Sequence, residues 1–225
     1  MSEEGESKVS PPIVCVVGKA KTGKTVLMEK LVVELKKRGY RVATVKHSHH
    51  GFDLDEEGKD SWKHAQAGAD TVVLSSPDKL AMIKKVDRDH TLAELSRFIG
   101  LDYDIILAEG FKKDNAFKIE VHRKEKGEDL LCIREELLAV ASNEPLELNI
   151  PQYHLDNASG IADLIEKRFL QGEDIEVMAL FVNGEQIPLS AFPKALISKT
   201  LLGMVTTLKK VSDPNSIDIS VRRKP

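Results

Sequence analysis

The residue types and spacing that point most clearly to chemistry form a glycine-rich segment, Gly18-Lys19-Ala20-Lys21-Thr22-Gly23-Lys24-Thr25. This segment fits the phosphate-loop pattern G-x-x-x-x-G-K-[ST], in which backbone N–H groups of a glycine turn surround the phosphates of a nucleotide. In that pattern the lysine, here Lys24, reaches the β and γ phosphates, and the hydroxyl, here Thr25, holds Mg²⁺. The predicted nucleotide contacts are Gly18, Lys19, Ala20, Lys21, Thr22, Gly23, Lys24, Thr25 and Val26.

The segments on either side of this loop meet the structural test for the motif. Residues 13–17 form a short apolar run rich in β-branched side chains, which is typical of a buried strand. Residues 26–35 carry apolar side chains at helical spacing. A strand that leads through a tight turn into a helix aims the free N–H groups and the positive dipole end of that helix at the phosphates.

A second candidate site residue is Glu109, which follows the segment Asp104 to Ala108, apolar after its first residue, and directly precedes Gly110. A carboxylate at the tip of a buried strand can hold magnesium or a water bound to it, as the second half of a phosphate-loop site requires. Glu109 is therefore predicted to act in catalysis and in metal binding. The alternative is an acidic residue that merely ends a strand, since aspartate is the usual residue there.

Polar residues crowd the segment after a second predicted strand, residues 40–46. Ligands of open α/β sheets bind at the carboxyl ends of parallel strands, so this segment is expected beside the phosphate loop. The predicted phosphate contacts there are Lys46, His47 and His50, the predicted magnesium contacts are Asp55 and Asp60, and Asp60 is also a catalytic candidate. Two alternatives stay open: a transition-metal site, because His47 and His49 share a face of an extended chain, and an ordinary solvated loop.

Asn143 ends another predicted buried strand, residues 137–141. The tip of this strand is expected on the same side of the sheet as the phosphate loop, so Asn143 is predicted to approach the nucleotide base. The N-K-x-D pattern that would specify guanine is absent. An ordinary turn at the strand end is the alternative reading.

The predicted fold class is α/β: a three-layer α/β/α P-loop NTPase with a mostly parallel sheet, followed by a small C-terminal β-β-α-β unit. The domain boundary is predicted after residue 172, giving domains 1–172 and 173–225. The further elements expected in the first domain are helices at 62–66, 91–98 and 161–169 and strands at 71–75, 80–83 and 117–122. The second domain is expected to contain strands at 177–182, 186–189 and 217–221 and a helix after Ser190.

Composition limits the function classes. The chain has 225 residues, 33 basic and 36 acidic residues and a formal net charge of -3, which argues against a general nucleic-acid binder. No apolar stretch approaches the ~20 residues of a membrane helix, and the acidic N-terminus is unlike a signal peptide, so we expect a cytoplasmic protein. The two cysteines, Cys15 and Cys132, are expected to remain thiols.

Five motifs together resemble the molybdopterin-guanine dinucleotide biosynthesis protein B family, MobB, over about residues 12–170. They are Gly18 to Thr25, Val45 to His50, Gly58-Lys59-Asp60-Ser61, Ala67-Gly68-Ala69 and Leu107 to Lys112. The resemblance implies a dimeric GTP-binding adaptor with slow GTPase activity, requiring Mg²⁺. Its implied partners are a MobA-like guanylyltransferase, which joins GMP to molybdopterin for molybdenum or tungsten enzymes, and molybdopterin-handling proteins.

Carried over residue by residue, the resemblance assigns phosphate and Mg²⁺ binding to Gly23, Lys24 and Thr25 and the second acidic motif to Glu109. It places Lys46, His47, His50, Asp55 and Asp60 along one side of the site, here called the switch side, which is formed by the polar segment after the second predicted strand.

Two other functions remain open at this stage. The loop also approximates that of partitioning-type ATPases, in which an extra lysine, here Lys19, reaches the nucleotide of a partner subunit. The third possibility is a chaperone that passes a metal or a pterin through the histidine-rich segment.

Overall fold

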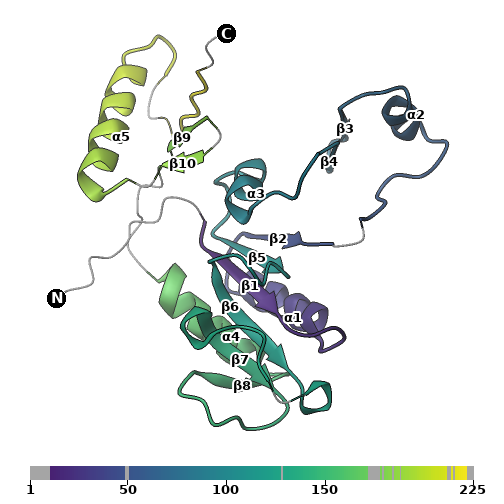
Figure 1. Cartoon of the computed structure of the whole chain (residues 1–225). Helices are drawn as coiled ribbons and strands as arrows, with labels where there is room; N and C mark the ends of the chain where they lie inside the picture. Colours follow the sequence, from purple (N-terminus) through teal and green to yellow (C-terminus); the bar gives the residue numbers. More distant parts are fainter. Residues whose placement is uncertain are drawn as a thin grey trace.

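A parallel sheet of six strands is the centre of the protein, in the order β2-β5-β1-β6-β7-β8 (Figure 1). The computed structural model describes residues 11–48, 51–127, 129–171, 178, 180–183, 185–187, 189–211, 214 and 216–221. The strands are β1 (Ile13–Val17), β2 (Val42–Lys46), β5 (Ile105–Glu109), β6 (Phe117–His122), β7 (Leu137–Ser142) and β8 (Gln152–His154). Every neighbouring pair in this sheet is parallel, which confirms the predicted α/β class.

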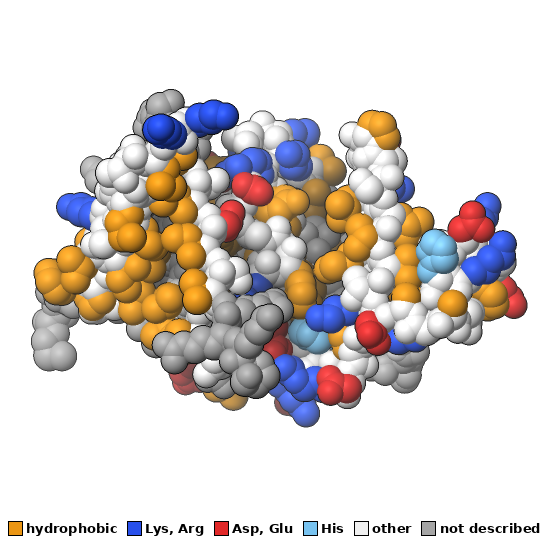
Figure 2. All heavy atoms as spheres, turned by 90° about the horizontal axis from the view of Figure 1, so that it is seen from above, with side chains coloured by type: hydrophobic (Ala, Val, Ile, Leu, Met, Phe, Trp, Pro, Cys, Tyr) orange, Lys and Arg blue, Asp and Glu red, His pale blue; other side chains and the backbone are white. Residues whose placement is uncertain are grey.

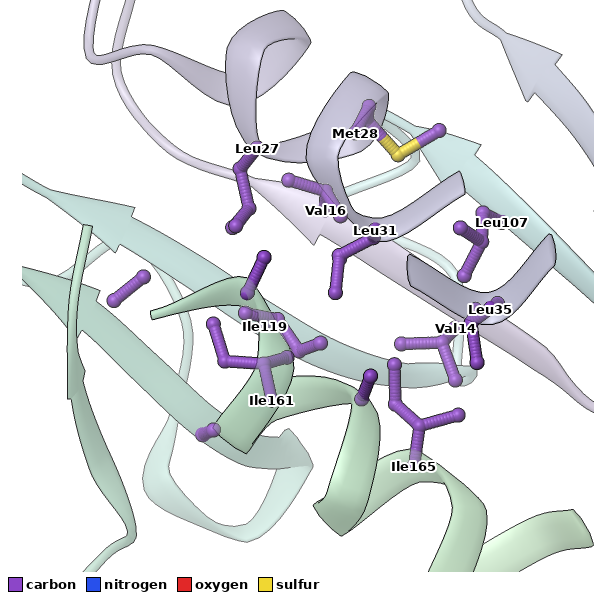
Figure 3. Packing of buried hydrophobic residues seen from close by; sticks show 14 of the residues in the cluster. Val14, Val16, Leu27, Met28, Leu31, Leu35, Leu107, Ile119, Ile161 and Ile165 are labelled. Carbon is purple, nitrogen blue, oxygen red and sulfur yellow. The ribbon is translucent and has the colours of Figure 1, made fainter. Parts of the chain in front are cut away.

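Helices cover both faces of the sheet, as the three-layer prediction requires. On one face, α1 (Lys24–Lys37) and α4 (Ala158–Ile165), which continues into a π-helical turn (Glu166–Leu170), pack on the main core. Figure 3 shows this core, in which Leu27, Met28, Leu31 and Leu35 of α1 meet Val14, Val16, Leu107, Ile119, Ile161 and Ile165. On the other face, Leu92 of α3 (Leu92–Ile99) belongs to a smaller cluster with Cys15, Val17 and Ala108. The sheet is therefore buried on both sides, which explains why its central strands are almost continuously apolar.

Between β2 and α3 the chain leaves the sheet and forms an arm, residues 60–84. The arm consists of α2 (Asp60–Gln66) and an antiparallel hairpin of β3 (Thr71–Ser75) and β4 (Leu80–Lys84), which together stand away from the sheet (Figure 1). Four large apolar side chains of the hairpin, Val73, Leu74, Leu80 and Met82, are exposed, and Leu80 is the most exposed of them, at 70%. Figure 2 shows hydrophobic side chains between charged ones along this arm, on the right of the view.

The C-terminal part contains a hairpin of β9 (Leu180–Val182) and β10 (Glu185–Ile187), followed by α5 (Ala191–Val205). The predicted closing strand at 217–221 is wrong, because the structure describes these residues without strand pairing. Alternating apolar and polar residues form a strand only where a partner edge is available, and Val221 is 84% exposed. The predicted boundary at 172–173 lies outside the described residues.

Two further features complete the fold. The guanidinium of Arg97 in α3 lies 4.3 Å from the centroid of the Phe181 ring in β9, so the C-terminal hairpin contacts the outer helix layer.

None of the helices in the described part of the chain combines the length and apolarity that a bilayer crossing requires.

Candidate nucleotide-binding site

The loop between β1 and α1 has the backbone of a phosphate cradle. Gly23, directly before α1, has a left-handed φ of 104°, which glycine adopts without strain. At Gly18 a Cβ would come within 2.5 Å of the carbonyl oxygen of Val121, so only glycine lets the loop lie this close to β6. The buried hydroxyl of Thr22 donates to the carbonyl of Lys19 at 3.0 Å and fixes the turn from inside.

Lys24 closes over this loop. Its Nζ donates to the carbonyl oxygens of Gly18 at 3.1 Å and Lys19 at 2.9 Å. The first turn of the 14-residue helix α1 contains no acidic residue, so nothing in that turn offsets its positive dipole end. The ammonium and the free N–H groups therefore combine into a site suited to phosphate.

Thr25 and Glu109 come together at the edge of the loop nearest β5. The Thr25 hydroxyl donates to both carboxylate oxygens of Glu109, each at 3.0 Å. The side chain of Glu109 is only 14% exposed, and the Lys46 ammonium lies 3.8 Å from it. A hydroxyl and a carboxylate are oxygen ligands of the kind Mg²⁺ prefers, with phosphate oxygens and waters completing the shell. The residues present therefore fit a magnesium ion held together with a nucleotide.

His47 lies beside this pair on the switch side. Its backbone N–H donates to the carbonyl of Glu109 at 3.1 Å, and its Nε2 is 3.3 Å from Asp89 Oδ2. After Gly110 the chain turns through Phe111, a non-glycine residue with φ 57°, whose ring centroid lies 5.1 Å from that of His47. A non-glycine residue keeps a left-handed backbone conformation only where contacts with its surroundings compensate the strain. Packing against His47 supplies that constraint.

The structure does not bring the other predicted acidic residues to the loop. Asp55 Oδ1 accepts from the hydroxyl of Ser61 at 2.8 Å, within the segment that leads into the arm. Asp60 begins α2, pairs with Lys63 at 3.3 Å and has a side chain that is 90% exposed. Figure 1 shows α2 far from the loop between β1 and α1. His50 lies outside the described residues.

Asn143 holds a turn. Its Oδ1 accepts from the backbone N–H of Lys124 at 3.2 Å, and its Nδ2 donates to the carboxylate of Glu125 at 3.1 Å. Its amide therefore contacts the backbone of one residue and the side chain of another in the turn just after β6. Its contact with a base stays a prediction.

Sequence reasoning missed Arg123, the residue directly after β6. Its Nε donates to the carbonyl of Thr22 at 2.7 Å, which joins two residues separated by 101 positions. One of its Nη groups lies 3.7 Å from where a Cβ on Gly23 would be. The signal that would have found it is its position, because residues that follow parallel strands gather at the ligand-binding edge of the sheet.

Comparisons with known proteins assign the family. A family model described as "Molybdopterin guanine dinucleotide synthesis protein B" (MobB) matches residues 13–143. The chain is also 39% identical over 159 residues to the molybdopterin-guanine dinucleotide biosynthesis adapter protein of Haemophilus influenzae, covering 69% of this chain and 88% of that protein. The chain belongs to the MobB family. The resemblance read from its motifs is thereby confirmed.

Other MobB relatives agree. The Escherichia coli adapter protein of the same description is 33% identical over 163 residues, and the alignment covers 70% of this chain and 93% of the Escherichia coli protein. The crystal structure of Bacillus subtilis MobB has a TM-score of 0.59 at 28% identity, covering 72% of this chain and 99% of that one. The alignment with a relative from Methanocaldococcus jannaschii, which is 24% identical over 232 residues, covers 93% of this chain and 97% of that relative. That alignment therefore also extends into the C-terminal part.

Proposed function

We propose that this protein is a GTP-binding adapter in molybdopterin-guanine dinucleotide biosynthesis. The observation that supports this proposal best is that Thr25 pairs with Glu109 beside the loop closed by Lys24. The loop offers a phosphate cradle and the pair offers a magnesium position, so both lie in one site. The adapter role comes from the printed description of the Haemophilus influenzae and Escherichia coli relatives. GTP with Mg²⁺ is the proposed cofactor, and the cytoplasm is the proposed place of action.

Hydrolysis by this site is proposed to be slow. Glu109 is hydrogen-bonded to Thr25, whereas Asp60, the other catalytic candidate, is on α2 in the arm. In this arrangement of the chain, the acidic residue at the start of the arm does not contribute to the site. A site that lacks the second acidic group suits an adapter that keeps GTP bound and hydrolyses it slowly.

The proposed partners are a second copy of this chain, a MobA-like guanylyltransferase and molybdopterin-handling proteins. The arm supports the homodimer, because an isolated two-stranded hairpin is marginally stable in water by itself. Val73, Leu80 and Met82 expose large apolar side chains on both of its strands. Burial against a second arm would remove this surface from water.

ATP remains the competing nucleotide. The phosphate loop by itself binds phosphates of either nucleotide, so the motif does not choose the base. Lys19, which the partitioning-type ATPase reading directs to a partner subunit, has its Nζ 3.1 Å from where a Cβ on Gly127 of the same chain would be. That position favours an intramolecular role for this lysine.

The function is tested by titration and reconstitution. In a calorimeter with Mg²⁺, we expect GTP to bind and ATP to bind more weakly. Added to a guanylyltransferase with molybdopterin and Mg-GTP, the protein should raise the yield of the guanine dinucleotide. A chain that binds neither nucleotide, or a yield that it leaves unchanged, would contradict the proposal.

A further inference from the structure

The position of the Thr25–Glu109 pair indicates where the nucleoside of a bound nucleotide would lie. In the sheet, β1, which leads into the phosphate loop, lies between β5 on one side and β6 on the other. A magnesium ion held by Thr25 and Glu109 would neutralise charge on the terminal phosphates, so these phosphates belong near Glu109, at the tip of β5. The nucleoside therefore extends over the opposite side, toward the ends of β6 and β7.

Arg123 occupies that side of the loop. It is half-buried, its Nε is committed to the carbonyl of Thr22 at 2.7 Å, and one Nη lies over Gly23. Within the described residues no carboxylate forms an ion pair with Arg123, and its Nη groups make no hydrogen bond. A guanidinium anchored through Nε thus keeps its two Nη groups, four N–H donors, for another ligand.

The turn that carries Arg123 is fixed from two directions. Asn143 at the tip of β7 accepts from the N–H of Lys124 and donates to Glu125. On the other side, Lys19 Nζ of the phosphate loop lies against Gly127. Because the turn is held at both ends, the guanidinium is pre-organised rather than free to follow solvent.

We propose that Arg123 reads the base of the bound nucleotide by donating from its Nη groups to O6 and N7 of guanine. Guanine presents these two acceptors side by side, whereas adenine presents one acceptor and an amino donor. Arginine has only donors, so it fits guanine and opposes adenine. Asn143 acts as a positioning residue through the turn. This inference rests on the proposed nucleotide site and deepens it by naming the residue that selects GTP.

The experiment measures affinities for GTP, ITP, 7-deaza-GTP and ATP by calorimetry with Mg²⁺. ITP keeps both O6 and N7, so it should bind within about twofold of GTP, because the bidentate contact is preserved. The 7-deaza analogue loses one acceptor and ATP loses the other, so each should bind roughly 5- to 150-fold more weakly than GTP. Wild-type protein that binds 7-deaza-GTP as tightly as GTP would overturn the proposal.

Substitutions test the residue itself. Arg123→Gln should remove the preference for GTP or reverse it, because a glutamine amide matches the N6 and N7 edge of adenine. Lys124→Gln is the matched control: it removes a positive charge from the same turn, at a side chain that pairs with Glu144 at 3.4 Å, and should keep the GTP-to-ATP ratio. Asn143→Ala should lower that ratio less than Arg123→Gln, since it only loosens the turn.

The outcomes separate this inference from the proposed function. If the wild type binds no nucleotide, the nucleotide site itself fails. If the wild type binds GTP through Lys24 but Arg123→Gln keeps the same GTP-to-ATP ratio, only the base-reading role fails. An equal loss of GTP and ATP would also reject base reading, because it marks Arg123 as a brace for the loop. If Arg123→Gln does not fold, the affinities of the wild type for 7-deaza-GTP and ITP still decide whether O6 and N7 of guanine are recognised.

Discussion

The Thr25 hydroxyl donates to both carboxylate oxygens of Glu109 at 3.0 Å, across 84 positions of the chain. This contact joins the start of α1 to the tip of β5 at the edge of the phosphate loop. Thr25 and Glu109 would supply two oxygen ligands for a magnesium ion, and their hydrogen bond already holds these two oxygen-bearing groups side by side.

Glu109→Gln should weaken GTP binding in the presence of Mg²⁺ by roughly 10- to 150-fold, because it removes a charge-assisted contact worth about 1.5–3 kcal/mol. With EDTA the affinity should change far less, since the lost charge favours the cation. Calorimetry under both conditions measures the difference. Glu29→Gln on the exposed side of α1 is the control. Equal losses with and without Mg²⁺ would assign Glu109 a structural role.

Lys24→Ala should lower GTP affinity by at least roughly tenfold while leaving the far-UV circular dichroism unchanged, because the ammonium contributes charge-assisted contacts to phosphate. Its own partners are the loop carbonyls of Gly18 and Lys19, so the rest of the core keeps its packing. Lys37→Ala, at the other end of α1, removes the same charge away from the loop and should bind like the wild type. Undiminished GTP affinity in Lys24→Ala would reject the phosphate-loop assignment.

The double substitution Leu80→Lys with Met82→Lys should raise the dissociation constant of the proposed homodimer by at least roughly tenfold, since each side chain loses its share of apolar burial. Sedimentation velocity across a range of concentrations measures this shift. Val33→Lys is the matched control, because Val33 is also exposed but lies on α1. A dimer that survives the arm substitutions would show that the arm does not hold it together.

Removing residues 174 to 225 should leave GTP affinity within about twofold, because the phosphate and magnesium candidates all lie upstream. The Arg97–Phe181 contact at 4.3 Å is lost, so a small decrease in Tm is expected from a cation–π pair worth about 0.5–1 kcal/mol at an exposed site. Calorimetry and thermal unfolding of the shortened chain check both points. A folded, shortened protein that no longer binds GTP would show that the C-terminal part completes the site.

Both cysteines should resist alkylation in the native protein. Burial raises the pKa of the Cys15 thiol to about 12 and that of the Cys132 thiol to about 11. At pH 8 the thiolate fractions are then on the order of 10⁻⁴ and 10⁻³, so iodoacetamide should react slowly until guanidinium unfolds the chain. Because the pKa is raised in the folded state, the neutral Cys15 thiol stabilises the fold below pH 9, and this contribution falls as pH rises toward 12. Rapid native labelling of Cys15 would contradict its burial.

The phosphate loop and its flanks could be predicted from the sequence because they are local. Residues 13–37 contain the strand, the turn and the helix in one continuous stretch, and each has its own periodicity or turn chemistry. The position of Glu109 at the end of a strand could be predicted for the same reason, since an apolar run that ends in a carboxylate and a glycine marks a strand tip. The parallel sheet followed from strands that alternate with helical segments.

The tertiary structure alone decided which strand tips lie side by side. The order β2-β5-β1-β6-β7-β8 brings Glu109 to Thr25 on one side and Arg123 to Thr22 on the other. Strand β8 escaped prediction because it is three residues long and largely polar, so its pairing with β7 gives no local signal. Residues 217–221 show the converse, because their alternation predicts a strand, whereas no strand in the described part of the chain pairs with them. Periodicity reports which face of an element is buried, whereas neighbours depend on contacts between distant parts of the chain.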